Sequence, residues 1–290
     1  MKTLLSGVQA HDVIVEPFPH VVVREPLDPR MCAQLLAEYP SLDIITRGRP
    51  FQSNQRFSYS ATRVLQDARI SPLWREVVAA HVSPSFWEEF IGLFGPSVGS
   101  LYPTLGQAGG GLASLKVGLR GSPDGSDPDV LLDAQICVNT PVTDRPTSVQ
   151  PVHLDVPKEL FAGLFYLRHP EDDSEGGDLE LYRFTTPSWR FDGRVADQTR
   201  VERIRTIRYD TNVLVLFVNS LQSLHGVSPR SVTSRPRCFL NVLGDLKGPL
   251  FDVSPFQTAA ALRREWLRRL RRGVSRLRRS LPIGQRPVPR

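Results

Sequence analysis

Residues 150–184 read QPVHLDVPKELFAGLFYLRHPEDDSEGGDLELYRF, and this stretch decides the fold. A polar segment with His153 and Asp155 precedes an apolar run, and an acidic, glycine-containing turn separates that run from a second one. Short apolar runs bounded by Gly, Pro, Asp and Ser are typical of β-strands. The stretch therefore predicts two strands joined by a polar turn, with His153 and Asp155 just before the first strand.

Similar apolar runs recur throughout the second half of the chain, without helical stretches between them. We expect strands at 115–119, 130–138, 163–167, 178–182, 203–208, 212–218 and 238–243. Seven short strands at such spacing favour an all-β sandwich or barrel over a parallel α/β sheet. The second half of the chain is therefore predicted to form a mainly β core.

The first hundred residues have a mixed pattern. β-Branched runs predict a strand within 13–23, and helical spacing of apolar residues predicts helices at 28–39, 72–81 and 85–94. Residues 43–68 are polar with weak periodicity, which indicates a loop or short strands. We therefore expect residues 1–100 to pack as strands and helices on a core of residues 101–250, with a separate C-terminal segment at 251–290.

Composition and cysteine usage are those of an ordinary globular protein. Of the 290 residues, 40% are hydrophobic and 23% are charged. The chain has no signal-peptide pattern and no uncharged apolar window of about 18 residues, so we expect a cytoplasmic protein. Cys32, Cys137 and Cys238 are widely spaced, which predicts reduced thiols and no disulfide framework.

The positive charge is concentrated in the last thirty residues. The whole chain has a net charge of +6, but residues 261–290 contain eleven arginines and one glutamate, so the remainder is mildly acidic. Leu262, Trp266 and Leu270 follow helical spacing among these arginines. This predicts a basic amphipathic helix that binds an anionic membrane surface or an acidic protein partner, and in the first case the protein would be peripheral to the membrane. The alternative is that the helix packs on the body while its arginines stay solvated.

His153, Asp155 and His225 are candidate metal ligands. Residues two apart in an extended chain project from the same face, with Cα atoms about 7 Å apart. His153 and Asp155 can therefore reach one ion, and His225 follows the apolar run 212–218 as a third ligand. Two histidines and one carboxylate are used by non-haem Fe(II) oxygenases, although zinc sites of the same composition exist.

The motifs around these residues occur in a characteristic order. They are His153-Leu154-Asp155, then Leu164-Phe165-Tyr166-Leu167, then Glu175-Gly176-Gly177-Asp178-Leu179, then Val213–Phe217 with His225-Gly226-Val227, and finally Arg237-Cys238-Phe239-Leu240-Asn241. In this order and spacing, residues 133–244 resemble the prolyl-4-hydroxylase-like branch of the 2-oxoglutarate/Fe(II)-dependent dioxygenase superfamily. The resemblance implies a double-stranded β-helix, also called a jelly roll, with the metal at its open end.

The resemblance also implies the cofactors and the residues that bind them. His153, Asp155 and His225 would hold Fe(II), and 2-oxoglutarate and O₂ would be co-substrates, with ascorbate as reductant. The distal carboxylate of 2-oxoglutarate would pair with a basic residue. Matching the R-x-x-L-N pattern gives Arg237, whereas counting ten residues beyond His225 gives Arg235.

Two polar residues on the strand expected at 130–138 are further candidates, because that strand should line the jelly roll. Gln135 and Asn139 could each bind 2-oxoglutarate or substrate, and a structural polar role is the alternative. The expected activity is hydroxylation of a small-molecule or sugar-linked substrate. Alternatives are a peptidyl-prolyl hydroxylase and a non-catalytic jelly-roll binding module. The acidic body disfavours a nucleic-acid substrate.

Overall fold

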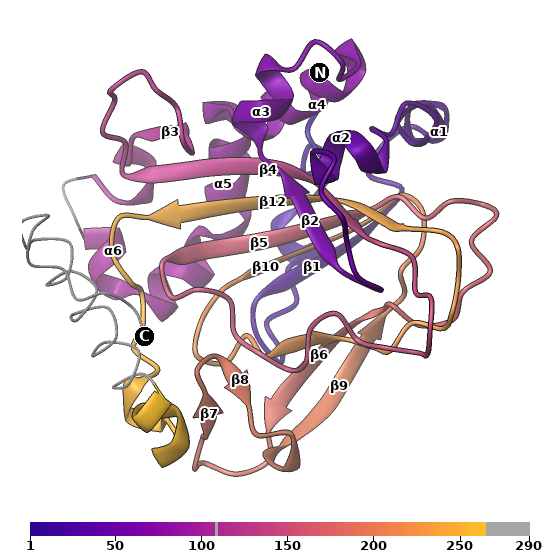
Figure 1. Ribbon diagram of the computed structural model, residues 1–290. Helices are drawn as coiled ribbons and strands as arrows, with labels where there is room; N and C mark the ends of the chain where they lie inside the picture. The colour runs from indigo at the N-terminus through magenta and orange to yellow at the C-terminus, as the bar shows by residue number, and fades with distance from the viewer. Residues whose placement is uncertain (108–109, 265–290) are drawn as a thin grey trace, which may run out of the picture.

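The computed structural model describes residues 1–107 and 110–264 and contains a large sheet that faces a smaller one (Figure 1). The large sheet has the order β1-β10-β5-β12-β4-β2, and β3 joins it parallel to β4. Its strands are β1 (His20–Arg24), β2 (Arg56–Tyr59), β3 (Val117–Leu119), β4 (Val130–Asn139), β5 (Glu159–Tyr166), β10 (Val213–Val218) and β12 (Arg237–Leu246). All its other pairings are antiparallel.

The smaller sheet has the order β11-β6-β9 and lies below the large sheet in Figure 1. Its strands are β6 (Leu179–Phe184), β9 (Val201–Ile207) and β11 (His225–Val227), and an antiparallel bridge from His153 to His225 extends it beyond β11. A separate hairpin is formed by β7 (Phe191–Asp192) and β8 (Val195–Ala196).

The chain alternates between the two sheets. It runs from β4 through the bridge at His153 to β5, crosses to β6 and β9, returns to β10, crosses to β11 and ends in β12. One layer consists of β4, β12, β5 and β10, and the facing layer consists of β9, β6, β11 and the segment bridged at His153. Two facing layers of four segments connected in this way form a double-stranded β-helix. The predicted fold class, mainly β with flanking helices around a jelly-roll core, is therefore confirmed.

Helices from the N-terminal region cover the other face of the large sheet (Figure 1). They are α1 (Pro29–Ala37), α2 (Leu42–Thr46), α3 (Ala61–Gln66), α4 (Pro72–His81), α5 (Pro84–Leu101) and α6 (Pro103–Gln107). Short 3₁₀ turns lie at Ala10–Asp12, Leu112–Ser114, Gln198–Arg200 and Ser254–Phe256. No helix in the described ranges is both long and apolar enough to cross a membrane.

Alternation along each strand divides the apolar residues into two layers. On β12, Leu240 and Val242 pack toward the helices, where Phe90 of α5 lies with its ring centroid 4.2 Å from that of Phe161. Phe239 points the other way and packs between the two sheets. Because side chains alternate between faces, one strand supplies both layers, and polar residues at the inward positions enter the space between the sheets.

The helix predictions hold for α4 and differ in length for α5. Ser71 and Ser83 accept hydrogen bonds from the backbone N–H groups of Trp74 and Phe86, each at 3.3 Å, and each serine is followed by proline. Serine caps followed by proline are strong helix starts. We expected the second helix to end at residue 94, before Pro96, but α5 continues through Pro96 to Leu101.

The segment 43–68 contains more helix than we expected. It includes the short strand β2, as predicted, but also the end of α2 and the whole of α3. Burial of Ile45 in α2 and of Ala61 and Val64 in α3 stabilises these short helices. Such burial depends on tertiary packing, which outweighs the weak local periodicity. The predicted basic helix lies outside the described residues from position 265 onward.

Candidate metal centre

The jelly roll places His153 and His225 directly opposite each other. The backbone N–H of His153 donates to the carbonyl of His225 at 2.8 Å, and the N–H of His225 donates to the carbonyl of His153 at 3.1 Å. In an antiparallel pair, residues that exchange both hydrogen bonds have side chains on the same face. The two rings therefore lie side by side, with centroids 4.4 Å apart.

Asp155 completes the group because it lies two residues after His153 on the same extended segment. Its Oδ1 is 3.6 Å from Nε2 of His153, and its Oδ2 is 3.5 Å from Nε2 of His225. The three candidate ligand atoms all lie within 4.8 Å of one another. One ion between them can contact all three, as the spacing of these residues predicted.

Backbone carbonyls fix the orientation of both imidazole rings. The Nδ1–H of His153 donates to the carbonyl of Pro151 at 2.8 Å, and that of His225 donates to the carbonyl of Ser223 at 2.9 Å. These bonds leave each Nε2 with a free lone pair that faces Asp155. Histidines that bind metals are usually held in this way, because the second hydrogen bond selects the tautomer.

The electrostatics of the group favour the protonation states of metal ligands. Burial lowers the pKa of His225 to about 4, although the nearby carboxylate of Asp155 raises it. For Asp155, burial acts to raise the pKa, but the two histidines outweigh it and hold the pKa below its usual range. At neutral pH His225 is therefore neutral and Asp155 is ionised.

The donor set suits a divalent transition metal. Two imidazole nitrogens and one carboxylate on one side of an ion leave neighbouring coordination positions for a small ligand or substrate. Zinc accepts the same donors, so these three residues alone do not select iron. The remainder of the cavity supplies the distinguishing features.

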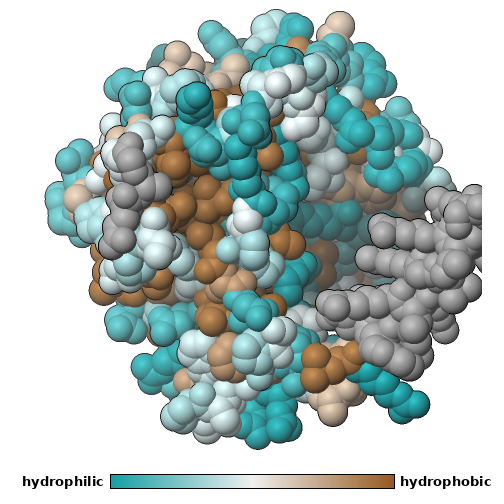
Figure 2. All heavy atoms as spheres, turned by 90° about the vertical axis from the view of Figure 1, so that its left-hand side faces the viewer, coloured by the Kyte–Doolittle hydropathy of each residue, from teal (hydrophilic) through white to brown (hydrophobic). Residues whose placement is uncertain are grey.

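A cavity of about 330 Å³ lies between the two sheets and is lined by all three residues of the triad. At one end of the large sheet, Arg237 of β12 lies opposite Asn139 of β4 in the strand register. At the other end, Glu159 of β5 lies opposite Asp245 of β12 in the register. A larger hollow of about 790 Å³ is lined by none of the triad residues. Figure 2, which views the left-hand side of Figure 1, shows a hollow with hydrophilic walls beside the grey atoms.

The end of the cavity at Arg237 contains buried polar atoms without partners. Nε of Arg237 donates to the carbonyl of Gly177 at 2.8 Å, and its Nη1 has a long contact of 3.5 Å with Oδ1 of Asn139. Nη2 of Arg237, Nδ2 of Asn139 and the hydroxyl of Tyr166 have no partner within the described part of the chain. Three neighbouring donors without acceptors fit a carboxylate, because an unpaired buried donor is costly.

Aromatic rings hold the Arg237 guanidinium in place. Its central carbon lies 4.8 Å from the ring centroid of Tyr166, 4.9 Å from that of Tyr209 and 5.0 Å from that of Phe239. Arg237 itself is only 2% exposed. The rings fix the cation without neutralising it, so its charge stays available to an anion in the cavity.

The second arginine predicted for this role lies elsewhere. Arg235 does not line the cavity, and its guanidinium forms an ion pair with Glu171 on the surface. Pro236 separates it from β12, so it belongs to the preceding turn. Of the two arginines, the structure brings only Arg237 to the side of the triad.

Gln135 and Asn139 both line the cavity, as expected for residues of the strand β4. Nε2 of Gln135 donates to Oδ2 of Asp133 at 2.7 Å, so its amide nitrogen is already engaged. Nδ2 of Asn139, beside Arg237, has no partner among the residues that the structure describes. The two candidates therefore differ, and Asn139 is the one with a donor to offer.

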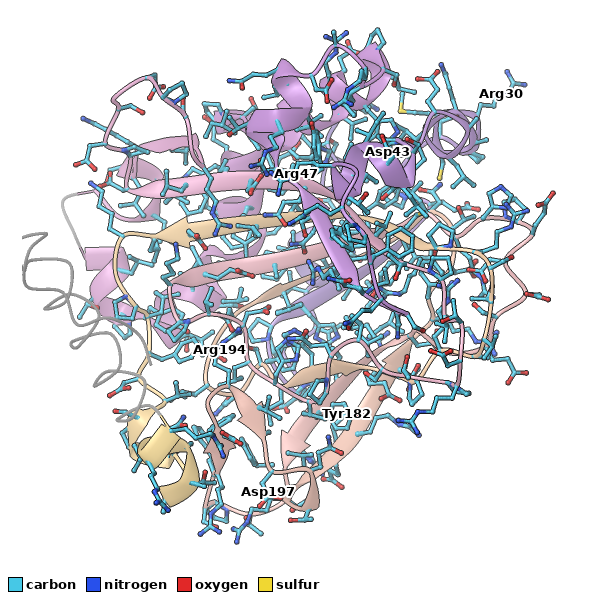
Figure 3. All side chains as sticks on the ribbon, viewed as in Figure 1. Arg30, Asp43, Arg47, Tyr182, Arg194 and Asp197 are labelled. Atoms are coloured by element: carbon cyan, nitrogen blue, oxygen red, sulfur yellow. The ribbon has the colours of Figure 1, made fainter. Side chains whose placement is uncertain are left out.

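Sequence reasoning missed six polar residues that line the cavity, among them Arg120, which follows β3, and Gln150, which precedes His153. Arg56 comes from β2, Glu159 from β5, Asn241 from β12, and Arg194 from the turn of the β7–β8 hairpin (Figure 3). Asn241 stands at an inward position of the strand predicted at 238–243, so alternation could have indicated it, whereas Glu159 lies before the strand predicted at 163–167 because β5 begins four residues earlier than expected. No local signal marks Arg56 or Arg194, because tertiary packing alone brings their segments to the cavity.

Comparisons with known proteins give structural matches only. No protein-family model matches the chain, and no curated protein matches it. A prolyl-4-hydroxylase from Pseudomonas putida is 13% identical with a TM-score of 0.42, and the match covers 79% of this chain and 93% of that chain. The epimerase SnoN, solved with Fe3+, alpha ketoglutarate and nogalamycin RO, is 12% identical with a TM-score of 0.44, covering 78% of each chain.

A prolyl hydroxylase from Trichoplax adhaerens, solved with a hypoxia inducible factor peptide fragment, is 14% identical with a TM-score of 0.41. That match covers 79% of this chain and 84% of the other. Two of these three structures are thus prolyl hydroxylases, the group that the sequence motifs resemble. Because the similarity is this low, the functional assignment rests on the side chains of the site itself.

Proposed function

We propose that this protein is an Fe(II)- and 2-oxoglutarate-dependent dioxygenase that hydroxylates a small organic substrate. One observation carries the proposal: the His153, Asp155 and His225 triad shares a cavity with the buried, aromatic-flanked cation of Arg237, whose Nη2 has no partner among the described residues. A zinc hydrolase would need the triad but has no evident use for this arginine. A dicarboxylic acid that chelates the metal at one end would use both the triad and Arg237.

Two groups of residues would bind the iron and the 2-oxoglutarate. His153, Asp155 and His225 would hold the iron, and Arg237, Asn139 and Tyr166 would bind the distal carboxylate of 2-oxoglutarate. Bound iron would supply the oxidative chemistry, in which O₂ converts 2-oxoglutarate to succinate and CO₂ and one oxygen atom enters a substrate C–H bond. The protein positions the substrate beside the metal and excludes competing reactions.

The direct test is formation of succinate. Protein purified without oxygen and supplied with Fe(II), ascorbate, 2-oxoglutarate and a panel of candidate substrates is expected to release succinate when air is admitted. His153→Ala removes one metal ligand and should abolish this release, whereas His11→Ala alters an exposed histidine distant in sequence and should not.

Two other results separate this proposal from its rivals. A protein that binds zinc tightly but gives no saturable binding of 2-oxoglutarate would contradict the proposal. Binding of both iron and 2-oxoglutarate without turnover on any substrate class would instead indicate a jelly-roll binding module. A peptidyl-proline substrate is a finer alternative, and proline-rich peptides in the panel test it.

A further inference from the structure

The end of the cavity away from Arg237 contains charged side chains that the proposed cofactor binding does not use. Arg56, Arg120, Arg194 and Glu159 all line the cavity together with the triad. They differ in whether the protein already supplies a partner for them. A side chain left without a partner inside a cavity is a candidate for substrate recognition, because burying a polar group unpaired is costly.

Glu159 is the side chain left without a partner. It begins β5, four residues after the metal-binding Asp155, and it is 8% exposed. Within the described residues its carboxyl group receives no hydrogen bond and forms no ion pair, although Arg56 and Arg120 lie near enough to act on its pKa and lower it in part. Burial, together with the charges of Asp155 and Asp245, raises its pKa.

The neighbouring carboxylates, in contrast, already have partners. Asp245 lies opposite Glu159 in the register of β12 and β5, and its Oδ2 forms ion pairs with Lys158 at 2.8 Å and with Arg120 at 3.3 Å, while its Oδ1 has no partner among the described residues. Arg120 also lies 3.9 Å from Asp133. Arg120 and Lys158 are therefore engaged by other carboxylates.

The other two arginines of the cavity are also held by the protein. Nη1 of Arg194 donates to the carbonyl of Leu154 at 2.7 Å. The guanidinium of Arg56 lies 5.2 Å from the ring centroid of Phe239, and with the amide of Asn241 suitably turned it donates to that side-chain oxygen at 3.3 Å. These arginines line the cavity with contacts in place, whereas Glu159 has none.

We propose that Glu159 is a specificity-determining residue that binds a protonated amine of the substrate beside the metal centre. The inference rests on the proposed function for the identity of the reaction, but the amine subsite follows from Glu159 itself. An ammonium group would donate a charge-assisted hydrogen bond to the carboxyl group and, as an opposite charge beside it, would favour its ionised form against burial. A neutral hydroxyl would supply the hydrogen bond without that opposite charge. The substrate class is therefore a small primary or secondary amine.

The test compares amines with their neutral counterparts in a binding assay. The probes are amino sugars, amino acid amides and arylalkylamines, each paired with its N-acetyl derivative, and titrated calorimetrically into protein loaded with Mn(II) and 2-oxoglutarate. Losing one charge-assisted hydrogen bond costs about 1.5 to 3 kcal/mol, which corresponds to roughly 10- to 150-fold in Kd. At least one amine is expected to bind more tightly than its acetylated partner by such a factor.

Variants assign that preference to the carboxyl group. Glu159→Gln keeps the size of the side chain and should erase the preference, whereas Glu159→Asp keeps the charge and should retain part of it. Glu180→Gln is the matched control: Glu180 is also buried, but it pairs with Arg203 and lies on the face of β6 opposite the cavity-lining Leu179. Glu180→Gln should leave the preference unchanged.

The outcomes distinguish this inference from the proposed function. A panel in which no amine is preferred to its acetylated partner, or in which Glu159→Gln keeps the preference, overturns the amine subsite. Tighter binding of carboxylates than of amines overturns it as well and points to Arg56 and Arg194. Failure of the proposed function has a different signature, because 2-oxoglutarate then does not bind although the amine preference, with its dependence on Glu159, persists.

Discussion

Replacing Arg237 by glutamine is the sharpest test of how the cavity binds a diacid. Nη2 of Arg237 has no partner in the described part of the chain, and its Nη1 contact with Asn139 is long, at 3.5 Å, so both nitrogens can turn to a carboxylate. Two charge-assisted hydrogen bonds contribute about 3 to 5 kcal/mol in a buried site. The Arg237→Gln variant should therefore bind 2-oxoglutarate roughly 100- to 5,000-fold more weakly.

The assay is calorimetric titration of Mn(II)-loaded protein, with 2-oxoglutarate and with 2-oxobutyrate, which lacks the distal carboxylate. The wild-type protein should prefer 2-oxoglutarate strongly, and Arg237→Gln should bind the two keto acids almost equally. This double comparison separates loss of the carboxylate contact from general damage to the cavity.

Arg235→Gln is the matched control because Arg235 is two residues away, pairs with Glu171 and does not line the cavity. It should leave both affinities unchanged. The reasoning is refuted if Arg237→Gln retains the preference for 2-oxoglutarate, or if Arg235→Gln is the variant that loses it.

Three further predictions concern the metal, the pH dependence and the core. Asp155→Asn should weaken Fe(II) binding by at least about 100-fold in a chelator competition, and unchanged affinity would mean that the triad does not hold the metal. His81 accepts a hydrogen bond from the Leu4 N–H and donates one to the Val77 carbonyl, and burial lowers its pKa to about 4. Because the pKa of His81 is lower in the folded protein than in the unfolded chain, the stabilisation from neutral His81 is complete above pH 6.5 and is lost toward pH 4. Relative to the His81→Gln variant, the wild-type protein should therefore lose about 3 kcal/mol of unfolding free energy over that interval, measured by urea titration. A difference between the two proteins that stays constant with pH would argue against this. Phe90→Ala should lower the unfolding free energy by about 3 to 5 kcal/mol at pH 7, since its ring packs 4.2 Å from that of Phe161, and a loss below 1 kcal/mol would contradict the assigned core.

The two faces of β12 explain why the cavity wall and the core can share one strand. Leu240 and Val242 pack against the helices, while Arg237, Phe239 and Asn241 point into the cavity between the sheets. The helices of the first hundred residues cover the apolar face and leave the polar face to the smaller sheet. This arrangement leaves room between the sheets for a cavity lined by charged groups.

The sequence by itself determined the features that depend on local order along the chain. Short apolar runs bounded by Gly, Pro, Asp and Ser indicated the strands of the jelly roll, and serine-proline pairs preceded both α4 and α5. The spacing of His153 and Asp155 placed two candidate ligands on one face, because the side-chain period of an extended chain is two. The apolar strand before His225 indicated a third candidate, and the three side chains converge in the structure.

Only the tertiary structure decided which side chains meet across the cavity. Arg237 and Arg235 lie two residues apart and are equally cationic, yet Pro236 leaves Arg235 in a turn, and strand pairing carries Arg237 inward to Asn139. Nothing in the sequence indicated that the carboxyl group of Glu159 has no partner among the described residues, because this depends on Arg120 and Lys158 forming ion pairs with Asp245. Contacts between segments distant in sequence leave no periodic pattern in the sequence, so they can be identified only from the assembled sheets.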